Sequence, residues 1–418
     1  MIRVRIAPSP TGIPHIGNTR TALFNFLFAR AKGGKFILRI EDTDRKRLVS
    51  SSLSAIYEIL DWLGLKPDEK YIQSERLGIY KKHARELLAK KLAYEKEGAV
   101  WFKITAGQTH WLDAVSNKKI SFRNENLQDF VILKSDGFPT YHLASVVDDH
   151  LMAISHVIRG DEWISSTPKH ILLYRAFRWR QPVFAHLPVV LGRGRLKLSK
   201  RTGAESVLYY RNKGYLKEAL LNYMVLLGWN PGGNREIMSM EEMIKLFRLE
   251  DINTAPPIFD IDKLNWFNGY YIRNLTDSEL FERLKPFINN HYDLNLVKKT
   301  IPLVKERMKT LLDYETNADF FFKEIKVSPK VIFRGELLNF EEIKPLAEEL
   351  EKLEGWESEE IERVVNAFII KNKLDKQRVY MQIRVGITGS TATPPLFETI
   401  EVLGKEKTIR RLKKTSNL

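Results

Sequence analysis

Two segments far apart in the chain carry residue types suited to holding phosphate groups. Residues 5–18 (RIAPSPTGIPHIGN) combine proline and glycine with a single histidine, just before a run with helical periodicity. The start of a helix favours an anion, and the glycines let a ligand approach the backbone. Residues 197–201 (KLSKR) add ammonium groups that can follow charge onto a leaving group. Each signal is weak alone, but together they predict a site that grips a triphosphate from two sides.

The elements that must position these segments alternate in type. Strand-like apolar runs lie at 35–40, 130–134, 154–159 and 183–190, and helical patterns at 53–65, 80–92 and 168–177. Such alternation predicts a parallel α/β sheet with helical crossovers. The polar stretch at 94–129 breaks the pattern. We expect it to be an insertion with a little β-structure around 101–104.

The second half of the chain has helical periodicity almost throughout. Helices are predicted at 216–227, 240–247, 263–272, 278–288, 296–314, 340–353, 358–371 and 377–386. The acidic run at 341–362 and the basic run at 405–414 are typical of solvated helix faces. This half is therefore predicted to be helical.

Composition limits the classes of protein open to the chain. Its 418 residues, 44% apolar and 28% charged, allow several domains with a substantial core. There is no cysteine, which excludes disulfides and thiolate metal sites and fits a reducing, cytoplasmic setting. Apolar runs are shorter than a membrane span, so no membrane association is expected. The net charge of +15 favours a nucleic-acid partner, although solubility alone would also account for it.

The two phosphate-type segments resemble signatures of a known enzyme family. Residues 8–18 (PSPTGIPHIGN) and 197–201 (KLSKR) resemble the HIGH and KMSKS motifs of class I aminoacyl-tRNA synthetases. Further segments narrow the resemblance to glutamyl-tRNA synthetases of the bacterial type: 39–45 (RIEDTDR), 134–142 (KSDGFPTYH), 157–163 (VIRGDEW), 386–389 (GITG) and 394–397 (PPLF). The similarity therefore extends over essentially the whole chain.

The resemblance implies a reaction and its partners. L-Glutamate and ATP, bound with Mg²⁺ as the substrate complex, would give glutamyl-adenylate, and the glutamyl group would then pass to the 3′-terminal adenosine of tRNA(Glu). A non-discriminating enzyme would also charge tRNA(Gln). The first step is expected to need bound tRNA. We expect a cytoplasmic monomer without membrane attachment.

The resemblance also implies an order of domains. An α/β Rossmann-type catalytic domain with a parallel sheet would comprise residues 1–93 and 130–180. A shortened acceptor-binding insertion would occupy 94–129, a stem-contact domain with the KMSKS-type loop 181–276, and an α-helical anticodon-binding region 277–418, with two subdomains that meet near residue 336. Relatives with zinc in the insertion hold it with cysteine, so no zinc is expected here. The short insertion is expected to grip the tRNA acceptor end less firmly.

The matched motifs assign roles to individual residues. ATP would be bound by Pro8, Gly12, His15, Gly17 and Lys200. Catalysis would rest on His15, Lys197, Ser199 and Lys200. Glutamate would be bound by Arg5, Ala7, Ser9, Glu41, Tyr141, Arg159 and Trp163. Asp44 would contact tRNA, and no protein-bound metal is expected.

Selection of glutamate over glutamine requires positive charge in the pocket. The two side chains differ by O⁻ against NH₂, and an amide gains little from an arginine fork. Arg5 and Arg159 are the candidates for the side-chain carboxylate, and Glu41 suits the α-amino group. Taken alone, Arg5 could be a strand-edge charge, and Glu41 could be a salt-bridge partner of Arg39 or Arg45.

Some positions depart from the family pattern, and other functions are open. Ser145 stands where some members carry Asn, and Asn18 replaces the second histidine of the HIGH motif, so it is not assigned to phosphate. Glutaminyl-tRNA synthetases typically carry Glu at the position of Ser9 and a β-barrel anticodon domain, and the glutamyl-queuosine relative lacks an anticodon domain. A non-catalytic tRNA-binding paralogue is a further alternative, but it would be expected to have lost His15 or Lys200. A small-molecule nucleotidyltransferase shares the HIGH-type loop, but it would not explain the helical half or the basic charge.

Overall fold

The computed structural model describes residues 1–196, 198 and 205–417. Two compact units make up the chain: unit 1 comprises Met1–Asn212 and Lys217–Phe267, and unit 2 comprises Lys213–Leu216 and Asn268–Leu418. Among the described residues, no helix is both long and apolar enough to cross a bilayer.

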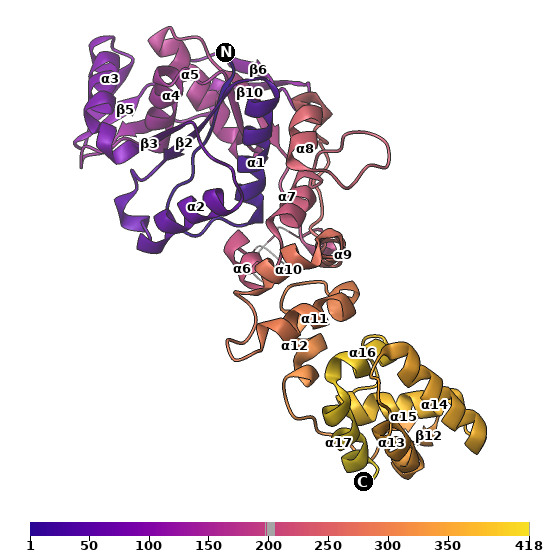
Figure 1. The fold of residues 1–418 in the computed structure, drawn as a ribbon. Helices are drawn as coiled ribbons and strands as arrows, with labels where there is room; N and C mark the ends of the chain where they lie inside the picture. The colour runs from indigo at the N-terminus through magenta and orange to yellow at the C-terminus, as the bar shows by residue number, and fades with distance from the viewer. Residues whose placement is uncertain (197, 199–204, 418) are drawn as a thin grey trace. The chain divides into compact units, whose positions relative to one another are not determined.

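Unit 1 is built on parallel strands. They are β1 (Arg3–Ile6), β2 (Lys35–Ile40), β3 (Glu69–Ile72), β9 (His156–Gly160) and β10 (Val183–Leu187). The order is β1-β2-β3 in one set and β10-β9 in the other. The two sets lie side by side, since the Ser155 backbone N–H donates to the Arg3 carbonyl at 2.9 Å. The predicted parallel α/β architecture is thereby confirmed (Figure 1).

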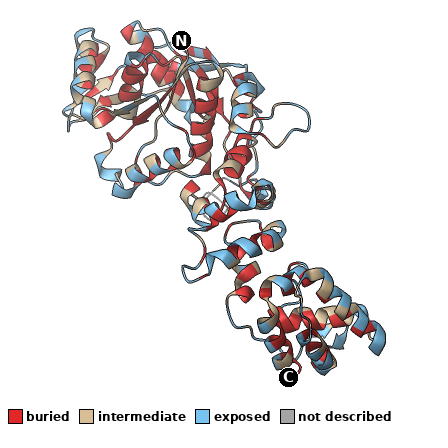
Figure 2. Ribbon diagram, in the orientation of Figure 1, coloured by how far each residue is buried: buried red, intermediate tan, exposed pale blue. Residues whose placement is uncertain are grey.

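Helices cover both faces of these strands. They are α1 (Ile16–Ala31) on one face and α3 (Leu77–Ala89), α4 (Tyr141–Leu151) and α5 (Thr167–Phe177) on the other. The unit also contains α2 (Ser50–Trp62), α6 (Val207–Asn212), α7 (Lys217–Val225) and α8 (Met240–Leu246), and α9 (Ile261–Asn274) begins in it. Helix α1 packs against β1, β2 and β9 and also against α7 and α8, and Figure 2 shows it buried along most of its length.

Strand alternation decides which side chains face the second helical layer. Phe36 of β2 contacts Phe26 of α1, whereas Ile37 belongs to a buried cluster with residues of α3, α4 and α5. Arg5 pairs with Ile37 in the sheet register, and Arg39 follows Ile37 by two residues. Since alternate residues share a face, both arginines lie on the face that α3, α4 and α5 cover.

Antiparallel strands occupy the region between α3 and α4. Strands β4 (Ala93–Lys96), β5 (Ala99–Phe102) and β8 (Phe130–Leu133) form one sheet, and β6 (Gln108–Leu112) and β7 (Lys119–Arg123) form another. The prediction that 130–134 belongs to the parallel sheet was wrong, because β8 pairs antiparallel with β5. Hydrophobic periodicity indicates a strand but not its partner or direction.

Unit 2 is mainly helical. Its helices are α10 (Asp277–Leu284), α11 (Leu294–Val304), α12 (Asp313–Ala318), α13 (Lys344–Glu351), α14 (Ser358–Asn372), α15 (Lys376–Thr388), α16 (Leu396–Leu403) and α17 (Lys405–Thr415). A short hairpin, β11 (Ile332–Phe333) and β12 (Glu336–Leu337), precedes α13.

The single helix predicted at 296–314 was wrong. Helix α11 ends at Val304, two residues after Pro302, and α12 begins only at Asp313. Helix α11 runs through Pro302, and a 3-10 turn at Lys305–Arg307 and extended backbone at Met308 separate it from α12 although the apolar pattern continues.

Candidate active site

The loop after β1 ends at His15, which caps helix α1. His15 Nδ1 accepts a hydrogen bond from the Gly17 backbone N–H at 3.0 Å, and Asn18 Oδ1 accepts one from the His15 backbone N–H at 3.4 Å. This reciprocal capping box starts the helix at Ile16. Because Nδ1 accepts, the proton of the neutral ring lies on Nε2, so that nitrogen is a donor.

Gly17 leaves room for the His15 ring. A Cβ added at Gly17 would lie 2.9 Å from His15 Cε1 and 3.1 Å from Nδ1. The sequence suggested that this glycine lets ATP approach the backbone. In the structure its N–H is donated to His15, and the imidazole fills the space beside it. The glycine therefore accommodates the His15 ring, and its assignment to ATP stays a prediction.

We expect Gly17→Ala to lower kcat for aminoacylation by about 10²-fold, the loss typical of removing one donor to developing charge. The new methyl group displaces the imidazole and breaks the cap, although alanine is otherwise the better helix former. Steady-state kinetics with saturating ATP would measure this. Gly78→Ala is the control, because a Cβ at Gly78 meets no atom within 4 Å. Wild-type kcat in the Gly17 variant would mean that the ring position does not matter.

Residues that follow the KMSKS-type segment lie against the same loop. Ser206 forms an isolated antiparallel bridge with His15, and the Ile16 N–H donates to the Glu205 carbonyl at 3.3 Å. The predicted residues Lys197, Ser199 and Lys200 lie outside the described residues, so their roles stay predictions.

A pocket opens at the carboxyl ends of β1, β2 and β9, where ligands bind in parallel α/β sheets. Its walls include most of the residues predicted to bind glutamate: Arg5, Ala7, Glu41, Tyr141, Arg159 and Trp163. A larger cleft adjoins it and is lined by the remaining candidates Ser9, Gly12, His15 and Asp44. The candidates Ala7, Pro8, Glu41, Tyr141 and Trp163 line both.

The structure thus brings the predicted glutamate and ATP residues into two adjoining hollows. There are two differences from the sequence-based assignment. Ser9 is exposed and lines only the larger cleft, and Gly17 lines neither hollow. Trp163 is 37% exposed and lies against Tyr141, with ring centroids 4.6 Å apart, so it forms one wall of the pocket.

Arg5 is a buried residue rather than an exposed charge at a strand edge. Its Nε donates to Asp149 Oδ1 at 3.1 Å, and both side chains are 4% exposed. Neither Nη group of Arg5 has a hydrogen-bond partner within the described part of the chain. Arg5 therefore brings two uncommitted donors to the pocket wall.

Glu41 is held by Arg39. Its Oε1 accepts from Arg39 Nη2 at 2.9 Å and from Nε at 3.2 Å, whereas Arg45 pairs with Asp42 at 3.8 Å. Among the residues described, Oε2 of Glu41 has no partner. Burial raises the pKa of Glu41, although the charges of Arg39 and Arg5 oppose this. A cationic ligand group would relieve that cost, as the proposed α-amino partner would.

Arg159 is a buried cation without an ion pair. It is 5% exposed, and no carboxylate in the described ranges forms an ion pair with it. Its donors reach neutral groups instead: Tyr141 Oη at 3.1 Å, Thr167 Oγ1 at 2.7 Å and His186 Nε2 at 3.3 Å, with longer contacts of 3.4 Å to His170 Nδ1 and the Trp163 carbonyl. Burial lowers the pKa of Arg159. A buried uncompensated charge is costly, and an anionic ligand would compensate it.

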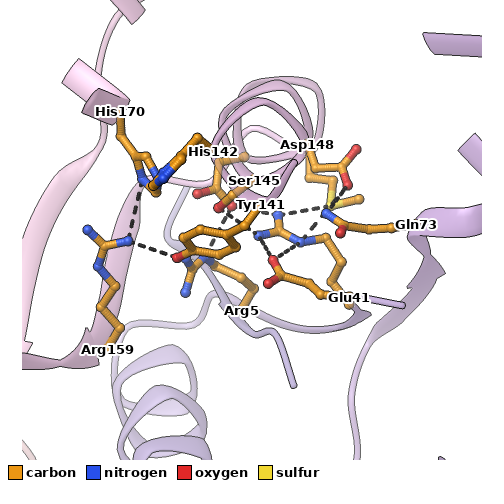
Figure 3. A network of polar contacts seen from close by, with 12 residues as sticks. Arg5, Glu41, Gln73, Tyr141, His142, Ser145, Asp148, Arg159 and His170 are labelled. Carbon is orange, nitrogen blue, oxygen red and sulfur yellow. Dashed lines mark hydrogen bonds and ion pairs between the residues drawn. The ribbon is translucent and has the colours of Figure 1, made fainter. Parts of the chain in front are cut away.

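Figure 3 shows Arg5, Glu41, Tyr141 and Arg159 close together. The geometry therefore offers two arginines for an acidic side chain and one carboxylate for an amino group. Both arginine forks match the planar carboxylate better than a lone ammonium does.

Sequence reasoning missed the residues that hold these groups from behind. They are Asp149 for Arg5 and Arg39, and Thr167, His170 and His186 for Arg159. Ser145, which departs from the family pattern, accepts from Arg39 Nη2 at 3.3 Å and so belongs to this supporting network. The adjacent aspartates of α4 could have been a signal, because two acids on a largely apolar helix need buried partners.

A metal site is not evident in the part of the chain that the structure describes. No group of three or more His, Asp or Glu side chains there is arranged to hold an ion. The expectation that the chain binds no zinc stays a prediction.

The fold and site are those of a class I aminoacyl-tRNA synthetase. The family model for the catalytic domain of class I tRNA synthetases (E and Q) matches residues 1–100 and 95–266, and a model for an anticodon binding domain matches 279–416. The chain belongs to the glutamate–tRNA ligase family within this class.

Individual relatives cover nearly the whole chain. A glutamate–tRNA ligase of Dehalococcoides mccartyi is 40% identical over 469 residues, which cover 98% of this chain and 96% of that protein. Glutamate–tRNA ligase 2 of Thermosipho melanesiensis is 39% identical over 459 residues, covering 100% and 99%. The crystal structure of a glutamate tRNA ligase from Elizabethkingia meningosepticum in complex with its amino acid has a TM-score of 0.89 and 32% identity, with 100% and 99% of the two chains covered.

Proposed function

We propose that this enzyme activates L-glutamate with MgATP and transfers the glutamyl group to the 3′-terminal adenosine of tRNA(Glu). The observation that carries the choice of amino acid is Arg159, a buried cation that forms no ion pair with any described residue, together with the Nη groups of Arg5, which have no hydrogen-bond partner there either. The neutral amide of glutamine would leave that charge uncompensated, and such mismatches allow strong discrimination. The names of the similar proteins support tRNA as the acceptor.

In the first step the α-carboxylate of glutamate attacks the α-phosphorus of ATP, a P–O bond forms, and pyrophosphate leaves. Arg5 and Arg159 hold the side-chain carboxylate, and Glu41 holds the α-ammonium. The His15 ring donates from Nε2 to phosphate oxygen, and Lys200 balances the charge on the departing pyrophosphate. The protein supplies orientation and charge stabilisation rather than covalent catalysis.

In the second step the terminal hydroxyl of tRNA attacks the carbonyl of glutamyl-adenylate, and AMP leaves. The larger cleft is the proposed entry for the acceptor end, because Arg45, Lys46, Arg47 and Lys134 line it. Asp44, the residue proposed to contact tRNA, accepts from Arg47 Nε at 2.6 Å at this rim. The pairing sets the direction of both side chains.

A shortened insertion at 94–129 is part of the proposal. The alignment with the Dehalococcoides protein is 469 residues long and so exceeds the 418 residues of this chain, which therefore lacks segments present in that relative. The catalytic-domain model also matches in two pieces that meet at 95–100. The alignment length supports missing segments somewhere in the chain, and the meeting point of the two pieces supports a loss at 94–129.

Aminoacylation of purified tRNA(Glu) and tRNA(Gln) with labelled glutamate tests the proposal. We expect the wild type to charge tRNA(Glu) and Lys200→Ala to be inactive, and additional charging of tRNA(Gln) would identify a non-discriminating enzyme. If neither tRNA is charged and the two proteins are equally silent, the enzyme assignment is wrong. ATP–pyrophosphate exchange should require tRNA, and strong exchange without it would contradict the tRNA requirement.

A further inference from the structure

The pocket residue Arg159 is linked through His186 to Asp113, which is distant from the pocket residues in sequence. Arg159 Nε donates to His186 Nε2 at 3.3 Å, and His186 Nδ1 donates to Asp113 Oδ2 at 2.7 Å. Asp113 lies in the turn between β6 and β7, and the His186 and Asp113 side chains are 1% and 2% exposed. Neither residue lines the pocket, so their contact with the ligand is indirect.

The direction of the hydrogen bonds in this chain is determined by the groups at its two ends. A guanidinium can only donate, so His186 must accept on Nε2 and carry its proton on Nδ1. That proton needs an acceptor. The ionised carboxylate of Asp113 provides one, because it has no proton of its own to donate. Burial acts to raise the pKa of Asp113, but the hydrogen bonds from His186 and the Ser116 backbone outweigh it and hold the pKa low. Burial lowers the pKa of His186, which keeps the ring neutral.

Asp113 also has a local role that any test must separate. Its Oδ1 accepts from the backbone N–H groups of Val115 at 3.2 Å and Ser116 at 3.1 Å, and its Oδ2 accepts from the His186 backbone N–H at 3.1 Å. The carboxylate thus closes its own turn and anchors β10 while it orients the imidazole. A loss of activity alone could come from either role.

We propose that Asp113 is a positioning residue for amino-acid recognition: through His186 it fixes the orientation of Arg159 toward the side-chain carboxylate of the substrate. This rests on the proposed function. The second pocket arginine, Arg5, is held directly by Asp149 of α4. The two arginines are therefore set by carboxylates from separate elements, one of which belongs to the region between α3 and α4.

Asp113→Asn is the first test. An amide has an acceptor on one side only, so its NH₂ must face either the turn N–H groups or His186 Nδ1. If the NH₂ faces His186, Nδ1 must accept, so the ring proton moves to Nε2. Two N–H groups, on His186 Nε2 and Arg159 Nε, would then point at each other. We expect the KM for glutamate to rise by about 10-fold or more, with a smaller change in kcat. Losses of this size are typical when the hydrogen-bond partner that orients a binding residue is removed. Selectivity for glutamate over glutamine should fall with it.

A double-mutant cycle with His186→Gln separates the two roles of Asp113. The glutamine oxygen can accept from Arg159 Nε without a fixed tautomer, so the KM for glutamate of this variant, whatever its own change, is the reference against which Asp113→Asn is measured a second time. In that background Asp113→Asn should add little, because its effect passes through the imidazole. A purely local role in the turn predicts that the penalty persists unchanged.

Two further variants complete the design. Asp129→Asn is the matched control, since Asp129 lies in the same region but accepts from the Ile104 N–H at 2.7 Å and from Tyr94 Oη at 3.1 Å. Asp113→Ser keeps a hydroxyl oxygen that can accept from the turn N–H groups, but it removes the acceptor for His186 Nδ1. This variant replaces Asp113→Asn in the test if the latter does not fold.

The outcomes distinguish this inference from the function on which it rests. A wild type that charges no tRNA with glutamate would overturn the proposed function. A wild type that charges tRNA, together with Asp113 variants of normal glutamate KM, would overturn the inference. An Asp113 penalty of the same size in the His186→Gln background would overturn it as well.

Discussion

Replacement of Arg159 by methionine is expected to lower kcat/KM for glutamate by about 10³-fold or more, while the folded state loses no stability. The first effect follows because the variant removes the one pocket cation that has no carboxylate partner within the described residues. The remaining arginine, Arg5, already shares its charge with Asp149. Discrimination against glutamine should collapse together with kcat/KM.

The expectation that Arg159→Met loses no stability follows from the groups that Arg159 hydrogen-bonds in the wild type. They are neutral and can pair again, since Thr167 Oγ1 lies 3.1 Å from the Trp163 carbonyl and 3.2 Å from His186 Nε2. Removing a buried unpaired cation also removes its desolvation cost. A structural arginine would behave differently, because its loss would lower the melting temperature.

Aminoacylation kinetics and thermal unfolding of the same preparation measure both halves. Arg175→Met is the control: this residue is an exposed arginine of α5 with one long contact, 3.4 Å, to the Gln108 carbonyl. It should change neither kcat/KM nor the melting temperature. A large drop in the melting temperature of the Arg159 variant would contradict the view of Arg159 as a binding group.

The sequence predicted the pocket through motif residues and missed what supports them. Arg5, Glu41 and Arg159 could be placed in one pocket from their motifs, because they lie on or just after strands that end at one edge of the sheet. Asp113 and Asp149 could not. Asp113 is a single acid in a polar stretch and resembles a solvated charge, whereas Asp149 had a signal in its neighbour Asp148, but its partners Arg5 and Arg39 become apparent only in the tertiary structure.

The fold shows the same division between local and non-local information. Periodicity located β2, β9, β10 and most helices, but it did not locate β3 (Glu69–Ile72), a short strand of largely polar sequence. It did not reveal that β8 (Phe130–Leu133) runs antiparallel to β5, because strand direction depends on a partner distant in sequence. Nor did it reveal the break between α11 and α12, because the apolar pattern continues across Lys305–Met308.

Arg39 is expected to show the opposite behaviour to Arg159 under the same substitution. It is 0% exposed, and its guanidinium contacts Asp149 at 2.6 Å, Glu41 at 2.9 Å and Asp148 at 4.0 Å. These charges outweigh burial and raise the pKa of Arg39. Arg39→Met removes the cation that these buried carboxylates share. Loss of one partner of a buried ion pair typically lowers the free energy of unfolding by about 3–5 kcal/mol. For a unit of this size we expect the melting temperature to fall by about 6 °C or more.

The pH dependence gives this last prediction its sharpest test. Burial acts to raise the pKa of Asp149, but Arg39 and Arg5 outweigh it and hold the pKa below its ordinary value. Asp149 therefore stabilises the wild type above the pKa of the unfolded chain, near about 4, and this contribution is lost as the pH falls. In Arg39→Met the carboxylate pKa values rise, so the variant's deficit should shrink between pH 7 and pH 4 as protonation removes the unpaired charges. A deficit that does not depend on pH would mean that lost packing, and not lost charge, accounts for it. Arg159→Met makes the same substitution at another buried site without stranding a carboxylate, so its stability should not show this dependence on pH.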